Sequence, residues 1–155
     1  MSTHRFFLIG LPGSGKTTLG KKLAKKRELS FIDLDEEIER AIGKSIPEIF
    51  SDDGEDKFRL IESNCLKEII YDKENFVLAT GGGTPCFFNN MQLMNESGVT
   101  VYINTPVAEI RKRLENDSSR PLMKIHSIEE LHKLREVWYK KAHRTIQHKN
   151  QITEI

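Results

Sequence analysis

The feature that most constrains this chain is a glycine-rich segment close to its beginning. Residues 10–17 read Gly-Leu-Pro-Gly-Ser-Gly-Lys-Thr and match the pattern G-x-x-x-x-G-K-[ST]. An apolar run at residues 6–9 precedes the segment, and Leu19, Leu23 and Ala24 follow it at helical spacing. A strand, a glycine-rich turn and a helix N-terminus together surround phosphate groups with backbone N–H donors. The sequence therefore predicts a phosphate-binding P-loop between the first strand and the first helix.

The P-loop residues have separate expected roles in holding a nucleotide. The glycines let backbone N–H groups turn toward the phosphates, and Lys16 adds a full positive charge. The hydroxyl of Thr17 is left to hold magnesium. We expect ATP to be bound in this loop by Gly10, Gly13, Ser14, Gly15, Lys16, Thr17 and Thr18.

Alternating strands and helices indicate the fold class. Apolar runs predict further strands at residues 31–32, 76–79, 99–103 and 151–155. Helical spacing predicts helices at residues 35–42, 56–71, 107–114 and 128 to about 146. Because the strands are mostly apolar along their length, we expect a three-layer α/β fold, with helices on both faces of a central parallel sheet. The polar residues 116–126 have the composition of a flexible loop.

Composition excludes several classes of protein. The 155 residues, 37% of them hydrophobic, suit a single domain spanning residues 1–155. The 24 basic and 23 acidic side chains nearly cancel, so we expect no binding to nucleic acid or to a membrane surface. Apolar runs are too short for a membrane span or a signal segment, which predicts a cytoplasmic protein. Cys65 and Cys86 lack metal-binding spacing and are expected to be reduced thiols, and we expect a monomer.

Asp33 and Asp35 follow the second predicted strand, at the edge where parallel sheets bind ligands. If the strand geometry continues, both side chains point to the same side, so that one can face a metal and the other an acceptor hydroxyl. The alternative is that both belong to an acidic first helical turn together with Glu36 and Glu37.

Gly81, Gly82 and Gly83 follow the strongly apolar strand at residues 76–79. Three successive glycines allow a ligand to approach the backbone and meet several donors. A plain tight turn is the alternative, but such a turn rarely needs three glycines in a row. These residues are therefore interpreted as part of a ligand site.

From the P-loop to about Tyr139, the chain resembles the shikimate kinases through several linked motifs. In chain order these are Asp33-Leu34-Asp35, Phe58-Arg59 with Glu62, Gly81-Gly82-Gly83, Arg120-Pro121-Leu122, and Arg135 with Tyr139. The resemblance implies a P-loop kinase fold like that of the nucleoside monophosphate kinases. It also implies an acceptor-binding region at about residues 34–62 and a mobile lid at about residues 115–126.

The resemblance implies that the γ-phosphoryl group of ATP is transferred to the 3-hydroxyl of shikimate, in the biosynthesis of chorismate and aromatic amino acids. Asp35 would bind that hydroxyl and accept its proton, and Arg59 and Arg135 would hold the carboxylate of shikimate. Without the resemblance, Arg59 is better interpreted as an exposed arginine paired with Glu55 or Glu62, and Arg135 as a solvated one. Gly81, Gly82 and Gly83 would present backbone donors to the acceptor.

The same resemblance implies roles on the nucleotide side. Lys16 and Arg120 would stabilise the transferred phosphate, and Asp33 would contact Mg²⁺ through water. Arg113 would stack on adenine, although its charged helix makes a solvated role the alternative. Related proteins continue beyond the position of Ile155 with a nucleotide-base loop and a closing helix, so we expect part of an adenine pocket to be missing from these residues.

One local departure and two rival functions remain. Glu136, Val137 and Trp138 stand between Arg135 and Tyr139, where the family often has proline and leucine, which puts local packing in question. A kinase for gluconate or a nucleoside monophosphate would have a similar P-loop and lid. A nucleotide-dependent switch or binding module is the rival of another class, although the chain has no asparagine-lysine-x-aspartate motif for guanine.

Overall fold

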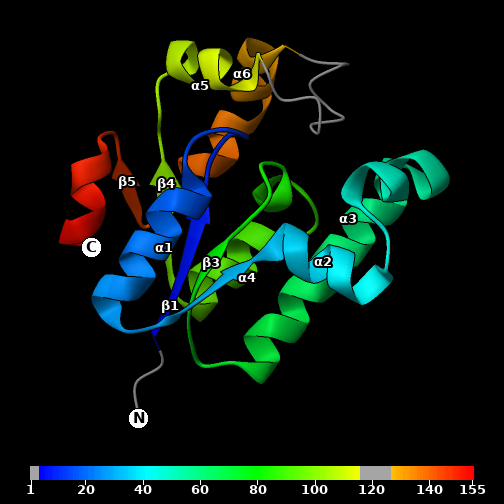
Figure 1. The fold of residues 1–155 in the computed structure, drawn as a ribbon, viewed down its shortest axis with the longest axis horizontal. Helices are drawn as coiled ribbons and strands as arrows, with labels where there is room; N and C mark the ends of the chain where they lie inside the picture. The colour runs from blue at the N-terminus through cyan, green and yellow to red at the C-terminus, as the bar shows by residue number, and fades with distance from the viewer. Residues whose placement is uncertain (1–3, 116–126) are drawn as a thin grey trace.

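A five-stranded parallel sheet forms the centre of the computed structural model, which describes residues 4–115 and 127–155 (Figure 1). Its strands are β1 (His4–Ile9), β2 (Ser30–Asp33), β3 (Asn75–Ala79), β4 (Val99–Ile103) and β5 (Arg144–Ile146). They lie in the order β2-β3-β1-β4-β5, and every neighbouring pair is parallel. The expected α/β fold with a parallel sheet is confirmed.

Helices cover both faces of this sheet because the side chains of each strand alternate between them. Phe7 and Ile9 pack on the face that also receives Leu34, Ile49 and Leu66, whereas Phe6 and Leu8 pack with Leu19 and Leu23 on the other face. The helices are α1 (Lys16–Arg27), α2 (Leu34–Ile42), α3 (Ile46–Asp72), α4 (Asn90–Ser97), α5 (Val107–Leu114) and α6 (Ile128–Tyr139), with short 3-10 helices η1 (Thr84–Cys86) and η3 (Lys149–Glu154). In Figure 1, α5 and α6 lie beyond the end to which β1 and β4 point. Among the helices of the described residues, none is long and apolar enough to cross a membrane.

Local sequence signals explain where several helices begin and end. The side chain of Ser45 and that of Glu48 form a reciprocal capping box at the start of α3. Gly43 ends α2 in the left-handed conformation, with φ of 78°. Gly54, with φ of 83°, interrupts α3 five residues before Arg59. The longer second half of α3 thus carries the first predicted acceptor arginine.

Two predictions for the C-terminal part of the chain are wrong. The helix expected to reach about residue 146 ends at Tyr139, and Arg144–Ile146 form β5 beside β4. The backbone N–H of Asn104 donates to the carbonyl of Ile146 at 2.9 Å. Residues 144–146 therefore extend the sheet at its β4 edge instead of continuing the helix. Residues 151–155 were expected to form a strand but lie at the end of η3, where Ile152 and Ile155, three residues apart, both pack into the core beside α1.

Candidate active site

The P-loop lies between β1 and α1 and uses glycine where the backbone needs it. Gly13 and Gly15 have φ of 77° and 102°, in the left-handed region that favours glycine. Gly15 is the N-cap of α1, so the loop opens directly onto a helix N-terminus. Lys16 is buried, and its Nζ donates to the carbonyl oxygens of Gly10 at 2.7 Å and Leu11 at 2.9 Å. The predicted positive charge therefore lies inside the curve of the loop.

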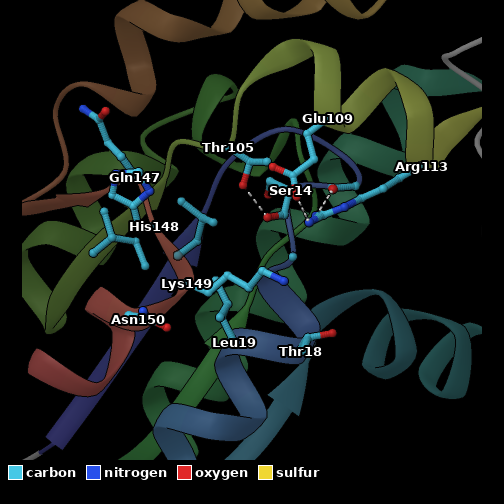
Figure 2. Close-up of a pocket in the computed structure, with 14 residues that line it drawn as sticks. Ser14, Thr18, Leu19, Thr105, Glu109, Arg113, Gln147, His148, Lys149 and Asn150 are labelled. Atoms are coloured by element: carbon cyan, nitrogen blue, oxygen red, sulfur yellow. Dashed lines mark hydrogen bonds and ion pairs between the residues drawn. The ribbon is translucent and has the colours of Figure 1, made fainter.

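A large cavity of about 660 Å³ lies on one side of the P-loop (Figure 2). Its wall includes Gly13, Ser14, Gly15 and Thr18, together with Arg113 from α5 and residues 147–150 that follow β5. Arg113 donates to the carbonyl of Gly13 at 2.8 Å and pairs with Glu109 at 2.6 Å, so it is tied to the P-loop. Thr105 also contacts the loop, donating to the carbonyl of Ser14 at 2.7 Å.

Residues 147–150 were missed by the sequence analysis, which expected part of this pocket to be absent. They were not predicted because the segment before them was interpreted as helix, whereas it forms the strand β5. Once a strand is recognised at Arg144–Ile146, the residues after it fall at the carboxyl edge of the sheet, where ligands bind. Gln151 shapes this loop, since its side-chain oxygen accepts from the backbone N–H groups of Gln147 at 2.7 Å and His148 at 2.9 Å.

A smaller cavity of about 180 Å³ lies on the other side of the P-loop. Lys16, Thr17, Asp33, Asp35, Gly81 and Gly82 line it. Gly15 and Thr18 line both cavities, so the two spaces meet at the P-loop. This arrangement places a phosphate-binding segment between a large cavity and a small polar one.

Asp33 and Asp35 line the same small cavity, but not through continued strand geometry. The strand ends at Asp33, which caps α2 by accepting from the backbone N–H groups of Asp35 at 2.9 Å and Glu36 at 3.3 Å. The other oxygen of Asp33 lies 3.4 Å from the Thr17 hydroxyl, which donates to it. Asp33 is thus the cap of α2 and Asp35 part of its acidic first turn, and both also line the cavity; their role in a ligand site stays a prediction.

The three glycines of residues 81–83 lie where an added side chain would come close to the predicted site residues. A Cβ on Gly82 would lie 2.7 Å from Nη1 of Arg135, and one on Gly83 would lie 2.6 Å from Nη2 of Arg59. A Cβ on Gly81 would approach Oδ1 of Asp35 to 3.3 Å. The loop therefore brings both arginines and Asp35 together along one short stretch of backbone.

Arg59 and Arg135 are both buried, with 3% and 7% of their surfaces exposed. The interpretation of either residue as a solvated surface arginine is therefore wrong. The pairs expected for Arg59 do form, with Glu62 at 3.0 Å and Glu55 at 3.1 Å, and its guanidinium lies 4.3 Å from the ring centre of Phe87. These contacts hold the guanidinium in a fixed orientation beside Gly83.

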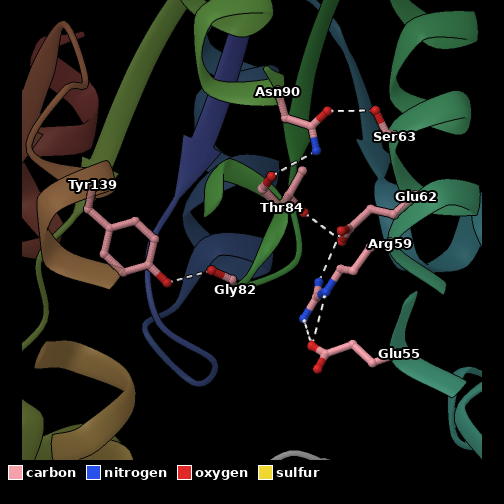
Figure 3. A network of polar contacts seen from close by, with 8 residues as sticks. All are labelled: Glu55, Arg59, Glu62, Ser63, Gly82, Thr84, Asn90 and Tyr139. Carbon is pink, nitrogen blue, oxygen red and sulfur yellow. Dashed lines mark hydrogen bonds and ion pairs between the residues drawn. The ribbon is translucent and has the colours of Figure 1, made fainter. Parts of the chain in front are cut away.

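A buried polar network extends from Arg59 and Glu62 to Thr84, Asn90 and Ser63, three residues that the sequence analysis did not select (Figure 3). Glu62 accepts from Arg59 and from the Thr84 hydroxyl, the latter at 2.8 Å. Asn90 donates to the carbonyl of Thr84 at 2.9 Å and accepts from Ser63 at 2.7 Å. The network joins α3, η1 and α4, and so fixes the glycine loop against the helix that carries Arg59.

Replacing Thr84 by valine is expected to lower the free energy of unfolding by about 1–3 kcal/mol, because the fully buried Glu62 carboxylate loses one of its hydrogen-bond donors. Urea unfolding measures this change. Thr145→Val, on an exposed position of β5, is the matched control and is expected to change stability by less than about 0.5 kcal/mol. An equal effect of the two substitutions would contradict the network.

The two cysteines are predicted to react slowly in the native protein. Burial raises the pKa of Cys65 and of Cys86 to about 11, although the charges of Arg135 and Arg59 oppose the shift at Cys86. Since only the thiolate reacts, alkylation by iodoacetamide at pH 7 should be about 100-fold slower than that of an unshifted thiol, and should accelerate as pH rises toward 11. The urea-unfolded chain is the control, and rapid labelling of the folded protein at pH 7 would refute the expectation.

Arg120 and the rest of residues 116–126 lie outside the described residues, so the predicted lid and its arginine remain predictions. The parallel sheet, the P-loop and the two cavities that meet at it together define a P-loop kinase. A family model described as shikimate kinase matches residues 12–155. The chain belongs to the shikimate kinase family.

Individual relatives agree with this assignment. The shikimate kinase of Azobacteroides pseudotrichonymphae is 54% identical over 129 residues, which cover 83% of this chain and 76% of the relative. That of Parabacteroides distasonis is 46% identical, and the match covers 97% of this chain and 91% of the relative. A solved structure of the shikimate kinase from Acinetobacter baumannii in complex with shikimate has a TM-score of 0.90 at 35% identity, covering 98% of this chain and 89% of the other.

Proposed function

We propose that this chain transfers the γ-phosphoryl group of ATP to the 3-hydroxyl of shikimate. The observation that carries the proposal is the pair of buried guanidinium groups that lie against Gly82 and Gly83, in the glycine loop whose first two residues line the small cavity together with Asp35. That cavity shares Gly15 and Thr18 with the larger one. Two buried arginines suit a ligand with a carboxylate, because a guanidinium can donate to both of its oxygens. The meeting of the cavities supports direct transfer from a nucleotide to that ligand.

On the acceptor side, Asp35 is the proposed base. Its carboxylate lines the cavity beside Gly81 and would accept the proton of the attacking hydroxyl. Arg59 and Arg135 would hold the carboxylate of shikimate, and Gly81, Gly82 and Gly83 would offer backbone donors to it. Positioning of the hydroxyl relative to the phosphate would account for much of the rate.

On the nucleotide side, the P-loop residues Gly10, Gly13, Ser14, Gly15, Lys16, Thr17 and Thr18 are proposed to hold the phosphates of ATP. The base would occupy the cavity of about 660 Å³ between Arg113 and residues 147–150. Arg113, held against Gly13 and Glu109, would stack there on adenine. Arg120 is proposed to reach the transferred phosphate from the lid.

The Thr17 hydroxyl and the Asp33 carboxylate fit a magnesium ion that comes with ATP. Both are hard oxygen groups, they lie 3.4 Å apart, and they line the same cavity as Lys16. Within residues 4–115 and 127–155, no cluster of three or more histidine, cysteine, aspartate or glutamate residues could hold a metal by itself. This agrees with Mg²⁺ held mainly by phosphate and water, with Thr17 as a direct ligand and Asp33 through water. When bound, Mg²⁺ neutralises phosphate charge.

ADP release from ATP and Mg²⁺ tests the proposed acceptor. Shikimate, gluconate and nucleoside monophosphates are added one at a time, with ATP alone as the control. Turnover that depends on shikimate supports the proposal. Turnover with gluconate or a nucleotide instead would replace the acceptor, and acceptor-independent hydrolysis would favour the nucleotide-dependent switch.

The single domain, the monomeric state and the cytoplasmic location remain predictions from the sequence. Size-exclusion chromatography with light scattering measures the mass of the particle directly. A mass near the 17.9 kDa of one chain would agree with a monomer, and twice that mass would contradict it.

A further inference from the structure

The hydroxyl of Tyr139 reaches from the end of α6 into the glycine loop. It donates a hydrogen bond of 2.5 Å to the carbonyl oxygen of Gly82 (Figure 3). The residue is fully buried, and its ring packs against that of Tyr102 with the ring centres 5.1 Å apart. Burial raises the pKa of this phenol, although the charge of Arg135 and a hydrogen bond with the Arg135 side chain oppose the shift. The hydroxyl therefore stays protonated and able to donate at neutral pH.

All three carbonyl groups of the glycine loop accept hydrogen bonds. The carbonyl of Gly81 accepts from the N–H of Thr84 at 3.1 Å, and that of Gly83 accepts from the N–H of Cys86 at 3.0 Å. These two bonds belong to the turn itself, whereas the bond to Gly82 comes from a different element of the fold. Because peptides between glycines rotate with little steric cost, the orientation of the Gly82–Gly83 peptide depends on the bond from Tyr139.

The orientation of this peptide decides where the N–H of Gly83 points. In a trans peptide the carbonyl and the following N–H point in opposite directions, and the described residues contain no cis peptide bond. The carbonyl of Gly82 points toward α6, so the N–H of Gly83 points away from α6. Figure 3 shows Tyr139 and Arg59 on opposite sides of Gly82, and Gly83 lies against the guanidinium of Arg59.

We propose that Tyr139 is a positioning residue: its hydroxyl fixes the Gly82–Gly83 peptide so that the N–H of Gly83 faces the acceptor. The inference rests on the proposed function, because it assigns that donor to the binding of shikimate. Tyr139 acts through the Gly82–Gly83 backbone, beside its hydrogen bond with Arg135, and does not itself contact the reacting atoms. The amide signals of the glycine loop report the backbone effect separately from any effect through Arg135. Its loss should therefore weaken acceptor binding more than it slows the chemical step.

Steady-state kinetics of Tyr139→Phe test this role, since phenylalanine keeps the buried ring and removes the hydroxyl. The KM for shikimate is expected to rise about tenfold, the effect of losing roughly one hydrogen bond. The kcat and the KM for ATP should change by less than about twofold, because the P-loop is untouched. Tyr102→Phe is the matched control, since it removes a buried tyrosine hydroxyl from the neighbouring ring on β4, and all three constants should stay within about twofold.

A second measurement needs neither ATP nor shikimate. In ¹H–¹⁵N spectra of the unliganded protein, the amide signals of Gly82 and Gly83 should shift in Tyr139→Phe and stay in place in Tyr102→Phe. Unmoved signals would overturn the proposal, as would an unchanged KM for shikimate or an equal rise in the KM for ATP. A wild-type protein that ignores shikimate would overturn the proposed function instead, and the amide signals would still show whether Tyr139 orients the loop.

Discussion

Replacing Asp35 by asparagine is expected to lower kcat for shikimate phosphorylation by about 10²–10⁴-fold, the usual contribution of a positioned base. Asparagine has nearly the same shape but cannot accept the proton of the attacking hydroxyl. The substitution should leave the fold intact, because Asp33 rather than the side chain of Asp35 caps α2. Initial rates at saturating ATP and shikimate, with a thermal melt of the same sample, measure both effects.

Glu36→Gln is the matched control for this prediction. It neutralises the adjacent carboxylate in the same helical turn, but Glu36 is exposed and does not line the cavity. Its kcat should equal that of the wild type. An Asp35→Asn protein that keeps more than about a tenth of wild-type kcat would show that another group accepts the proton.

Replacing Arg59 by alanine is expected to affect both stability and acceptor binding. Removal of the guanidinium leaves Glu62, which is completely buried, without its ion-pair partner, and breaking such a pair costs about 3–5 kcal/mol of folding free energy. The KM for shikimate should rise by about 10²-fold or more, since each charge-assisted hydrogen bond to a carboxylate contributes roughly 1.5–3 kcal/mol. Urea unfolding and shikimate titration of the kinase rate measure the two effects separately.

The double substitution Arg59→Ala with Glu62→Gln separates the effect of Arg59 on stability from its effect on shikimate binding. Glutamine removes the unpaired charge and can still accept from the Thr84 hydroxyl, so most of the stability should return. Affinity for shikimate should not return, because the guanidinium is still missing. Recovery of both properties would show that Arg59 acts on folding alone, through its pair with Glu62.

Local patterns predicted the P-loop and the strand and helix on either side of it. The P-loop is a contiguous motif whose strand, turn and helix are all encoded within a few residues, so its position between β1 and α1 could be read directly. The N-caps Ser45 and Ser127 are signals of the same local kind, because each accepts a hydrogen bond from the backbone N–H three residues later. Such signals need no knowledge of tertiary structure.

Contacts between distant segments were harder to predict. Helical periodicity predicted that α6 extends to about residue 146. Residues Arg144–Ile146 instead pair with β4, and this pairing depends on a sheet edge that distant residues form. The hydrogen bonds of Thr84 and Tyr139 have no sequence signature either, since their partners lie 22 and 57 positions away. Burial of Arg59 and Arg135 also became visible only in the folded chain, although the linked motifs had singled out both residues.

The position of Gly15 and Thr18 at the edge of both cavities has a consequence for inhibitor design. A compound that joins an adenine nucleotide to a small carboxylic acid through a phosphate chain would occupy both cavities, with the phosphates at the P-loop between them. Binding of its first half would hold the second at a high effective concentration beside its own pocket. The acid half is expected to favour proteins that, like this one, hold two buried arginines close to the P-loop.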